Sequence, residues 1–162
     1  SFNGGRKMNG VTKITVSDDI TLVNLIDIPT DLVFASEIFG LFASHNINID
    51  MISQSTPSSD QFNLSFTVPG TELENTLVIA SAIREKYPKV KIAVNSGNSK
   101  IELYDEEMKN TYGVAYKAMK ALADAKVIVN LITTSEVELS FLISSVYTEI
   151  AVEAFAKVFQ AQ

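Results

Sequence analysis

The sequence contains no cysteine, and this absence excludes disulfide bonds and thiolate metal sites. A chain without disulfides is consistent with a reducing cytosol, so we expect a cytoplasmic protein. Basic residues are also scarce, because 13 Lys and Arg residues face 19 Asp and Glu residues and give a formal net charge of −6. This balance argues against nucleic acid as a partner, since binding to phosphates calls for basic patches.

Long apolar runs and catalytic groups are missing as well. No apolar run reaches the length of a membrane span and no signal-peptide pattern is present, so we expect no membrane partner. The sequence shows no nucleophile paired with a base, no metal-ligand cluster and no phosphate-binding loop. We therefore expect no catalytic residue, no metal and no cofactor in this chain.

The sequence does contain an internal repeat. Residues 47–55, Ile-Asn-Ile-Asp-Met-Ile-Ser-Gln-Ser, match residues 127–135, Val-Ile-Val-Asn-Leu-Ile-Thr-Thr-Ser, with Asp50 opposite Asn130. The preceding helical segments keep the same offset of about 80 residues. With 46% hydrophobic residues, this repeat predicts two compact units that each have a core of their own.

Periodicity predicts the order strand, helix, strand, strand, helix, strand in the first unit. The expected elements are a strand over 20–27, a helix over 33–46, strands over 47–55 and 61–69, a helix up to about Tyr87 and a strand over 89–95. Asp31 is expected to cap the first helix, and Thr71 with Glu74 to form a capping box for the second. The inward faces are expected to carry Phe34, Ile38, Leu41 and Phe42, and Leu73, Leu77, Ala80 and Ile83.

The second unit follows a link at Gly97-Asn98 and is one strand short. Its expected elements are strands over 100–105, 127–135 and 137–145 and helices over 113–126 and 148–160. The inward faces are expected to carry Val114, Ala118, Met119 and Leu122, and Ile150, Ala154, Phe155 and Val158. An open sheet edge is a liability, so we expect the spare strand 11–17, set off by a turn at Asp18-Asp19, to complete this sheet.

The expected fold class is therefore α+β, with two ferredoxin-like βαββαβ units whose helices cover one face of antiparallel sheets. The first unit, residues 20–97, would be inserted into the second, which consists of residues 11–17 and 99–160. Residues 1–10 are polar and Gly-rich, and we expect a flexible lead-in or a remnant of cloning.

Two stretches carry a resemblance to a known family. The segment 47–55 followed by Leu64-Ser65-Phe66-Thr67-Val68 resembles an ACT domain, and the second unit resembles it through residues 108–115 and 131–136. The tandem, over residues 11–160, resembles the regulatory half of aspartate kinase. The inserted arrangement is also that of the family.

The resemblance implies a function. Aspartate kinase phosphorylates the side-chain carboxylate of aspartate with ATP and Mg, and its ACT domains bind lysine or threonine and inhibit the kinase. The N-terminal kinase domain and its Lys-x-Gly-Gly motif are absent from this sequence, so we expect a non-catalytic regulatory fragment that forms a homodimer through ACT–ACT pairing. The alternative is a stand-alone tandem-ACT protein that binds a ligand or a partner without a kinase.

An amino-acid effector needs donors for its carboxylate and acceptors for its ammonium. A loop that runs into a helix start supplies backbone N–H groups, and an acidic strand residue supplies the acceptor. In the first unit, the resemblance and this chemistry together indicate Ile28, Asp31, Phe34, Ala35, Asp50, Gln54 and Ser55. The second-unit candidates are Met108, Asn110, Gly113, Val114 and Ser135.

Each unit carries a different part of the family's site signature. The family has glycine at the helix start, where the first unit has Val33 and the second keeps Gly113. Conversely, the first unit has Asp50 where the second has Asn130. A side chain at position 33 restricts the backbone and crowds a ligand. The sequence leaves open which unit binds the effector.

Overall fold

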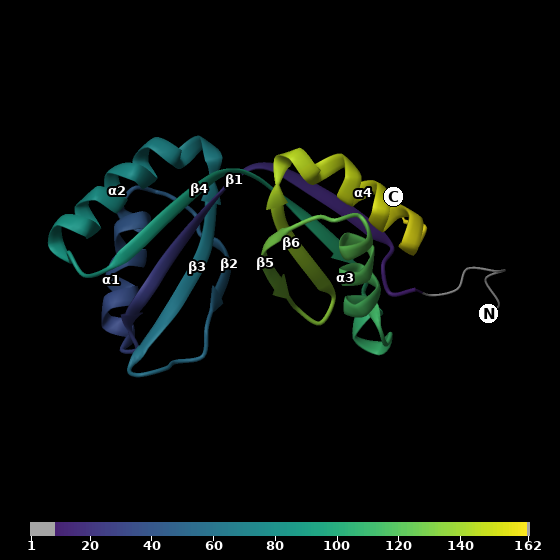
Figure 1. Ribbon diagram of the computed structural model, residues 1–162, viewed down its shortest axis with the longest axis horizontal. Coiled ribbons are helices and arrows are strands. Elements are labelled where there is room, and N and C mark those ends of the chain that lie inside the picture. The colour runs from purple at the N-terminus through teal and green to yellow at the C-terminus, as the bar shows by residue number, and fades with distance from the viewer. Residues whose placement is uncertain (1–8, 162) are drawn as a thin grey trace. The chain divides into compact units, whose positions relative to one another are not determined.

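The computed structural model describes residues 9–161 (Figure 1). The chain divides into two compact units, one formed by Asp19–Asn98 and the other by the residues up to Asp18 together with those from Ser99 onward. The first unit is thus inserted into the second. Of the expected lead-in over 1–10, residues 1–8 lie outside the described part. Gly10 is not flexible lead-in, because it is buried with φ of +84° and a Cβ there would meet Val114 Cγ2 at 2.4 Å.

The first unit is a four-stranded sheet in the order β2-β3-β1-β4, covered by two helices on one face. Its elements are the later part of β1 (Lys13–Pro29), α1 (Leu32–Ser44), β2 (Asp50–Gln54), β3 (Gln61–Pro69), α2 (Leu73–Lys86) and the earlier part of β4 (Lys91–Tyr104). β3 pairs antiparallel with both β1 and β2. β2 is therefore an edge strand of this unit.

The second unit repeats the pattern with the strand order β1-β4-β6-β5. Its own elements are α3 (Val114–Asp124), β5 (Val129–Thr134), β6 (Glu138–Ser144) and α4 (Thr148–Phe159). The start of β1 lies beside β4, where the Thr12 backbone N donates to the Tyr104 carbonyl O at 2.9 Å. Val11 is buried in this unit's core together with Ile101 and Phe155.

At two positions where the sequence suggested that a strand ends, the structure has a continuous strand. The sequence predicted a turn at Asp18-Asp19, which is wrong because β1 runs through it. The predicted link at Gly97-Asn98 does lie where the first unit ends, but it is part of β4 and not a loop. Asp19 has φ of +56° and Gly97 has φ of +74°. Left-handed residues of this kind form bulges as well as turns, so the residue type alone did not distinguish the two.

The helices bury somewhat different residues from those expected. Leu77, Met119, Ile150 and Val158 were predicted to face inward, but they are exposed by 40% or more. The buried faces instead carry Thr76, Ile79, Ala80 and Ile83 on α2, Val114, Ala118, Ala121 and Leu122 on α3, and Ala151, Phe155 and Phe159 on α4. α3 and α4 pack against each other, and alanine at the contact allows close approach of helices.

The predicted capping box at the start of α2 is also wrong. A 3₁₀ turn over Gly70–Glu72 leads into the helix, and no side chain caps its first N–H groups. The Asn75 amide donates to the Glu72 carboxylate at 2.9 Å, so the side-chain bond at this helix start differs from the expected pair. A 3₁₀ turn satisfies part of the helix start through i→i+3 bonds, which reduces the need for a cap.

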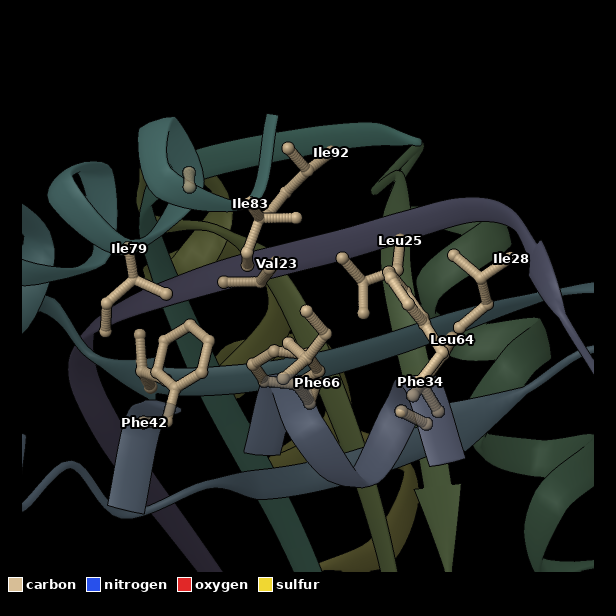
Figure 2. Packing of buried hydrophobic residues seen from close by; sticks show 14 of the residues in the cluster. Val23, Leu25, Ile28, Phe34, Phe42, Leu64, Phe66, Ile79, Ile83 and Ile92 are labelled. Atoms are coloured by element: carbon tan, nitrogen blue, oxygen red, sulfur yellow. The ribbon is translucent and has the colours of Figure 1, made fainter. Parts of the chain in front are cut away.

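Each unit has its own hydrophobic core. In the first unit, the Phe42 ring meets the Phe66 ring edge-on at 5.2 Å (Figure 2). The Phe39 ring meets Phe66 in the same way at 5.1 Å. In the second, Phe141, Phe155 and Phe159 are fully buried. Among the described residues, no helix is long and apolar enough to cross a membrane.

The role of the first strand leads to a stability prediction. A chain that begins at Ile20 loses Val11 and the strand beside β4, and we expect it to lose at least about 2 kcal/mol of unfolding free energy through lost burial, and to aggregate through the exposed edge. Thermal melts and light scattering measure both effects. A chain that begins at Asn9 is the control. Equal melting temperatures and equal solubility of the two chains would contradict the prediction.

Candidate functional site

The start of α1 is organised by Pro29 and Asp31. Pro29 ends β1, and Asp31 is the N-cap residue with extended backbone angles. Its carboxylate Oδ1 accepts a hydrogen bond from the Val33 backbone N at 2.7 Å. The predicted cap is thereby confirmed, and the carboxylate also lies at the positive end of the helix dipole.

Three of the predicted first-unit residues are core residues. Ile28 is fully buried, and Phe34 and Ala35 are 8% and 5% exposed. Ile28 and Ala35 can therefore reach a ligand mainly through their backbone, whereas part of the Phe34 ring lines a pocket. Val33 is 74% exposed and lies in the first turn of α1, so its side chain is not packed into the fold.

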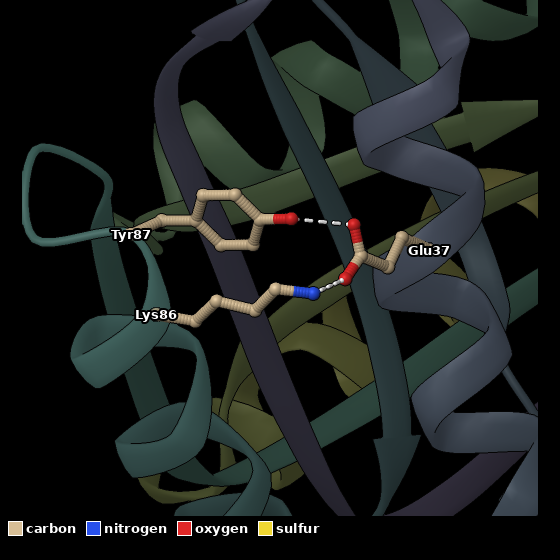
Figure 3. Close-up of polar contacts among 3 residues, drawn as sticks. All are labelled: Glu37, Lys86 and Tyr87. Atoms are coloured by element: carbon tan, nitrogen blue, oxygen red, sulfur yellow. Dashed lines mark hydrogen bonds and ion pairs between the residues drawn. The ribbon is translucent and has the colours of Figure 1, made fainter.

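A polar contact ties α1 to the end of α2. The Tyr87 hydroxyl donates to Glu37 Oε2 at 2.5 Å, and the Lys86 ammonium forms an ion pair with Glu37 Oε1 (Figure 3). The hydrogen bonds from Lys86 and then Tyr87 lower the pKa of Glu37 below its ordinary value. The bond to Glu37 in turn raises the pKa of both Lys86 and Tyr87. At neutral pH the contact therefore holds an ionised carboxylate between two donors.

A pocket of about 770 Å³ opens beside this contact. It lies between the start of α1 and the turn that follows α2. Its lining residues are Asp27, Pro29, Asp31, Val33, Phe34, Glu37, Gln61, Lys86, Tyr87, Pro88, Lys89 and Val90. Of the predicted site residues, only Asp31 and Phe34 belong to this lining.

Asp50, at the first position of β2, lies away from the start of α1. Asp50 pairs with Thr67 on β3, whereas Ile28, next to the start of α1, pairs with Phe62. Five residues along β3 separate these two levels, which corresponds to roughly 17 Å. Asp50 and the α1 N–H groups of one chain therefore cannot hold the two ends of one small amino acid.

The other two candidates, Gln54 and Ser55, lie at the end of β2 that is close to the level of the α1 start. Gln54 is exposed and pairs with Leu64. The Ser55 backbone N donates to the Asn63 carbonyl O, and Ser55 Oγ accepts from the Asn63 backbone N, each at 2.9 Å. Ser55 is thus engaged in holding β2 to β3.

The second unit presents a related but distinct helix start. Gly113 is the N-cap residue of α3 with φ of +84°, and a Cβ there would meet nothing within 4 Å. The backbone conformation therefore explains this glycine, while the surrounding space stays open. α3 begins two repeat positions later than α1, so Val33 and Gly113 occupy different positions relative to their helices.

The remaining second-unit candidates make local contacts. The Asn110 amide donates to Glu107 Oε2 at 2.8 Å, Met108 packs against the core, and Val114 is buried. The Ser135 backbone N donates to the Glu138 carbonyl O at 2.9 Å, which closes the β5–β6 turn. Among residues 9–161, no group of three or more acidic, His or Cys side chains could hold a metal ion.

The Glu37 contact gives a pH prediction. We expect NMR titration to find the Glu37 carboxyl pKa below its ordinary value of 4.5, and Lys86→Met to raise it. A depressed pKa stabilises the fold above the ordinary value, and that stability is lost as pH falls through the folded pKa. The stability difference between wild type and Glu37→Gln should therefore shrink below about pH 4.5.

The Lys120→Met variant is the control for this titration, because Lys120 pairs with Asp124 in the other unit. It should leave the Glu37 pKa unchanged. An unshifted Glu37 pKa in the wild type, or an equal response to both lysine variants, would contradict the prediction.

Comparison with known proteins identifies the family. The ACT domain model matches residues 30–81 and 101–159. The aspartokinase of Bacillus sp. strain MGA3 is 29% identical over 150 residues, which cover 93% of this chain and 36% of that protein. The regulatory subunit of aspartate kinase from Thermus thermophilus has a TM-score of 0.83 at 25% identity, covering 93% of this chain and 99% of that one.

The aspartate kinase from Synechocystis has a TM-score of 0.88 at 29% identity, covering 95% of this chain and 28% of that one. This chain thus spans about a third of the length of the aspartokinase from Bacillus sp. and nearly all of a regulatory subunit. The ACT match falls on both units and on the helices and strands that repeat between them. The chain belongs to the ACT domain family, as a tandem pair that corresponds to the regulatory portion of aspartate kinases.

Proposed function

We propose that this ACT pair senses an end product of the aspartate family, lysine first and threonine second, and that binding inhibits an aspartate kinase. The support is the match of nearly the whole chain to regulatory portions of aspartate kinases. In this proposal, ATP and Mg belong to a kinase domain outside this chain. The protein acts in the cytoplasm.

The observation that carries the site proposal is the separation of Asp50 from the start of α1 within one chain. β2 is an edge strand, and it can pair with an edge strand of a second copy. A two-fold antiparallel pairing centred on Ile52 would turn the partner's β2 around, so that the partner subunit's Asp50 would lie opposite Gln54. Gln54 is at the end of β2 that lies level with the start of α1.

The effector site then forms between two copies. The α1 N–H groups of one copy bind the effector's carboxylate, and the partner subunit's Asp50 binds an ammonium. Lysine carries two ammonium groups and threonine one, so a carboxylate at this position favours lysine. A homodimer is part of the site, because neither copy holds both halves.

The second unit offers the competing location. There Gly113 leaves open space at the start of α3, and Asn130 replaces the carboxylate. A neutral amide accepts a hydrogen bond from an ammonium but supplies no charge, so this location suits threonine better than lysine. Substitutions in the two units separate the two locations.

A second candidate function is that of a regulatory subunit, in which the ACT pair and the kinase are separate chains. This chain covers 99% of the regulatory subunit from T. thermophilus, so a chain of this extent serves as a subunit there. In that arrangement the effector site is the same, and the kinase is contacted as a separate chain. Co-purification with a catalytic subunit would distinguish this from a fused kinase domain.

The first test is the affinity for lysine. Replacing a charged partner in a partly buried site costs on the order of 1.5–3 kcal/mol, so Asp50→Asn should weaken lysine binding roughly tenfold to a hundredfold by calorimetric titration. Asn110→Ala, in the second unit, should leave lysine affinity unchanged. Unchanged affinity in Asp50→Asn, with a loss in Asn110→Ala, would move the site to the second unit.

The second test is the pairing itself. Because the chain has no cysteine, Ile52→Cys introduces a single thiol on the exposed centre of β2, where Ile52 is 54% exposed. In the proposed dimer this thiol meets its own copy near the two-fold axis, and mild oxidation should give a covalent dimer. Leu77→Cys, on the exposed face of α2, is the matched control. Equal cross-linking of both variants, or a monomer by light scattering at high concentration, would rule out the pairing.

A further inference from the structure

The pocket beside Glu37 shares Asp31 and Phe34 with the predicted effector residues but none of those predicted at β2. It lies on the flank of α1 that faces the end of α2, whereas Asp50, Gln54 and Ser55 lie on the edge strand and do not line it. Its volume of about 770 Å³ is within the range of small-molecule sites, roughly 300–1,000 Å³. The pocket is formed entirely within the first unit.

The walls of the pocket are mainly apolar. Phe34 and Tyr87 form one wall, with ring centroids 4.8 Å apart and an interplanar angle of 81°. The rest of the apolar lining comes from Pro29, Val33, Pro88 and Val90. Such a lining suits a ligand with a flat or aliphatic apolar body.

The charges around the pocket favour a cation. Glu37 and Lys86 neutralise each other in the contact shown in Figure 3. The other charged residues of the lining are Asp27, Asp31 and Lys89, which leaves one negative charge in excess. An anionic ligand would therefore meet more repulsion than a cationic one.

The aromatic wall already holds an ammonium. The Lys86 Nζ lies 5.3 Å from the centroid of the Tyr87 ring, which is a cation–π distance. Because Lys86 occupies this ring and is paired with Glu37, a ligand ammonium would instead meet the carboxylates of Asp27 and Asp31.

We infer that this pocket is a second binding site of the ACT pair, and that it takes a primary amine carried on a small apolar body. The inference goes beyond the proposed function and does not depend on it. The two sites share the start of α1 but lie on different flanks of it. A free amino acid fits this pocket less well than an amine, because its carboxylate would add to the excess negative charge of the lining near Asp27.

Three probes of similar shape test the ligand class. Benzylamine, benzyl alcohol and benzoate are titrated into the full chain, and backbone amide shifts are followed by NMR. We expect benzylamine to shift the amides of residues 33–37 and 87–90 and to bind at least about fivefold more tightly than benzoate, with benzyl alcohol between them.

Two aspartates on β1 allow a matched test of where the ligand binds. Asp27 lines the pocket and Asp19 does not, although both lie on β1 with φ of +56°. Asparagine tolerates this conformation, so Asp27→Asn and Asp19→Asn remove the same charge with little backbone cost. Asp27→Asn should weaken benzylamine binding by about two- to fivefold, and Asp19→Asn should leave it unchanged.

Several results would overturn the inference. These are no benzylamine binding at millimolar concentration, shifts outside the pocket, benzoate binding as tight as benzylamine, or equal effects of the two aspartate variants. Lysine titration of the same proteins separates this inference from the proposed function. Loss of lysine binding in Asp50→Asn bears on the effector site alone, because Asp50 does not line the pocket.

Discussion

Two strands that continue from one unit into the other determine the whole arrangement. β1 leaves the second unit after Asp18 and becomes a central strand of the first, and β4 returns the chain in the same way at Ser99. Each unit keeps its own core, yet neither can complete its sheet without both strands. The helices bury their apolar faces only against complete sheets, so helix packing in both units depends on these two strands.

The sequence predicted the features that local chemistry controls. The cap at Asp31 follows from the short-range bond between a carboxylate and a helix N–H, and β3 has the bounds that its pattern indicates. The α2 face was predicted correctly at Ala80 and Ile83. It was wrong at Leu77, because the helix instead buries Thr76, whose polarity a hydrophobic pattern cannot rank as core. Met119 was placed inward because α3 has apolar residues on two sides, and only packing against α4 decides which side is buried.

The candidate site shows a second limit of sequence reasoning. Its residues were assigned to correct elements, but strand register decides which of them meet. Asp50 lies five residues of β3 from the level of Ile28, a separation that depends on tertiary pairing. The contact between Glu37 and Tyr87 joins positions 50 residues apart, and no local pattern in the sequence connects them.

The insertion of one unit into the other has a consequence for synthesis on the ribosome. The strand that the second unit needs from the N-terminal side emerges first, but its partner segments follow only after Ser99. The first unit, Asp19–Asn98, is continuous and can fold as soon as it has emerged. During that interval the early half of β1 has no neighbour in its own sheet. Lys13 and Asp18 lie on that half, and charged side chains on an unpaired strand disfavour pairing with other chains.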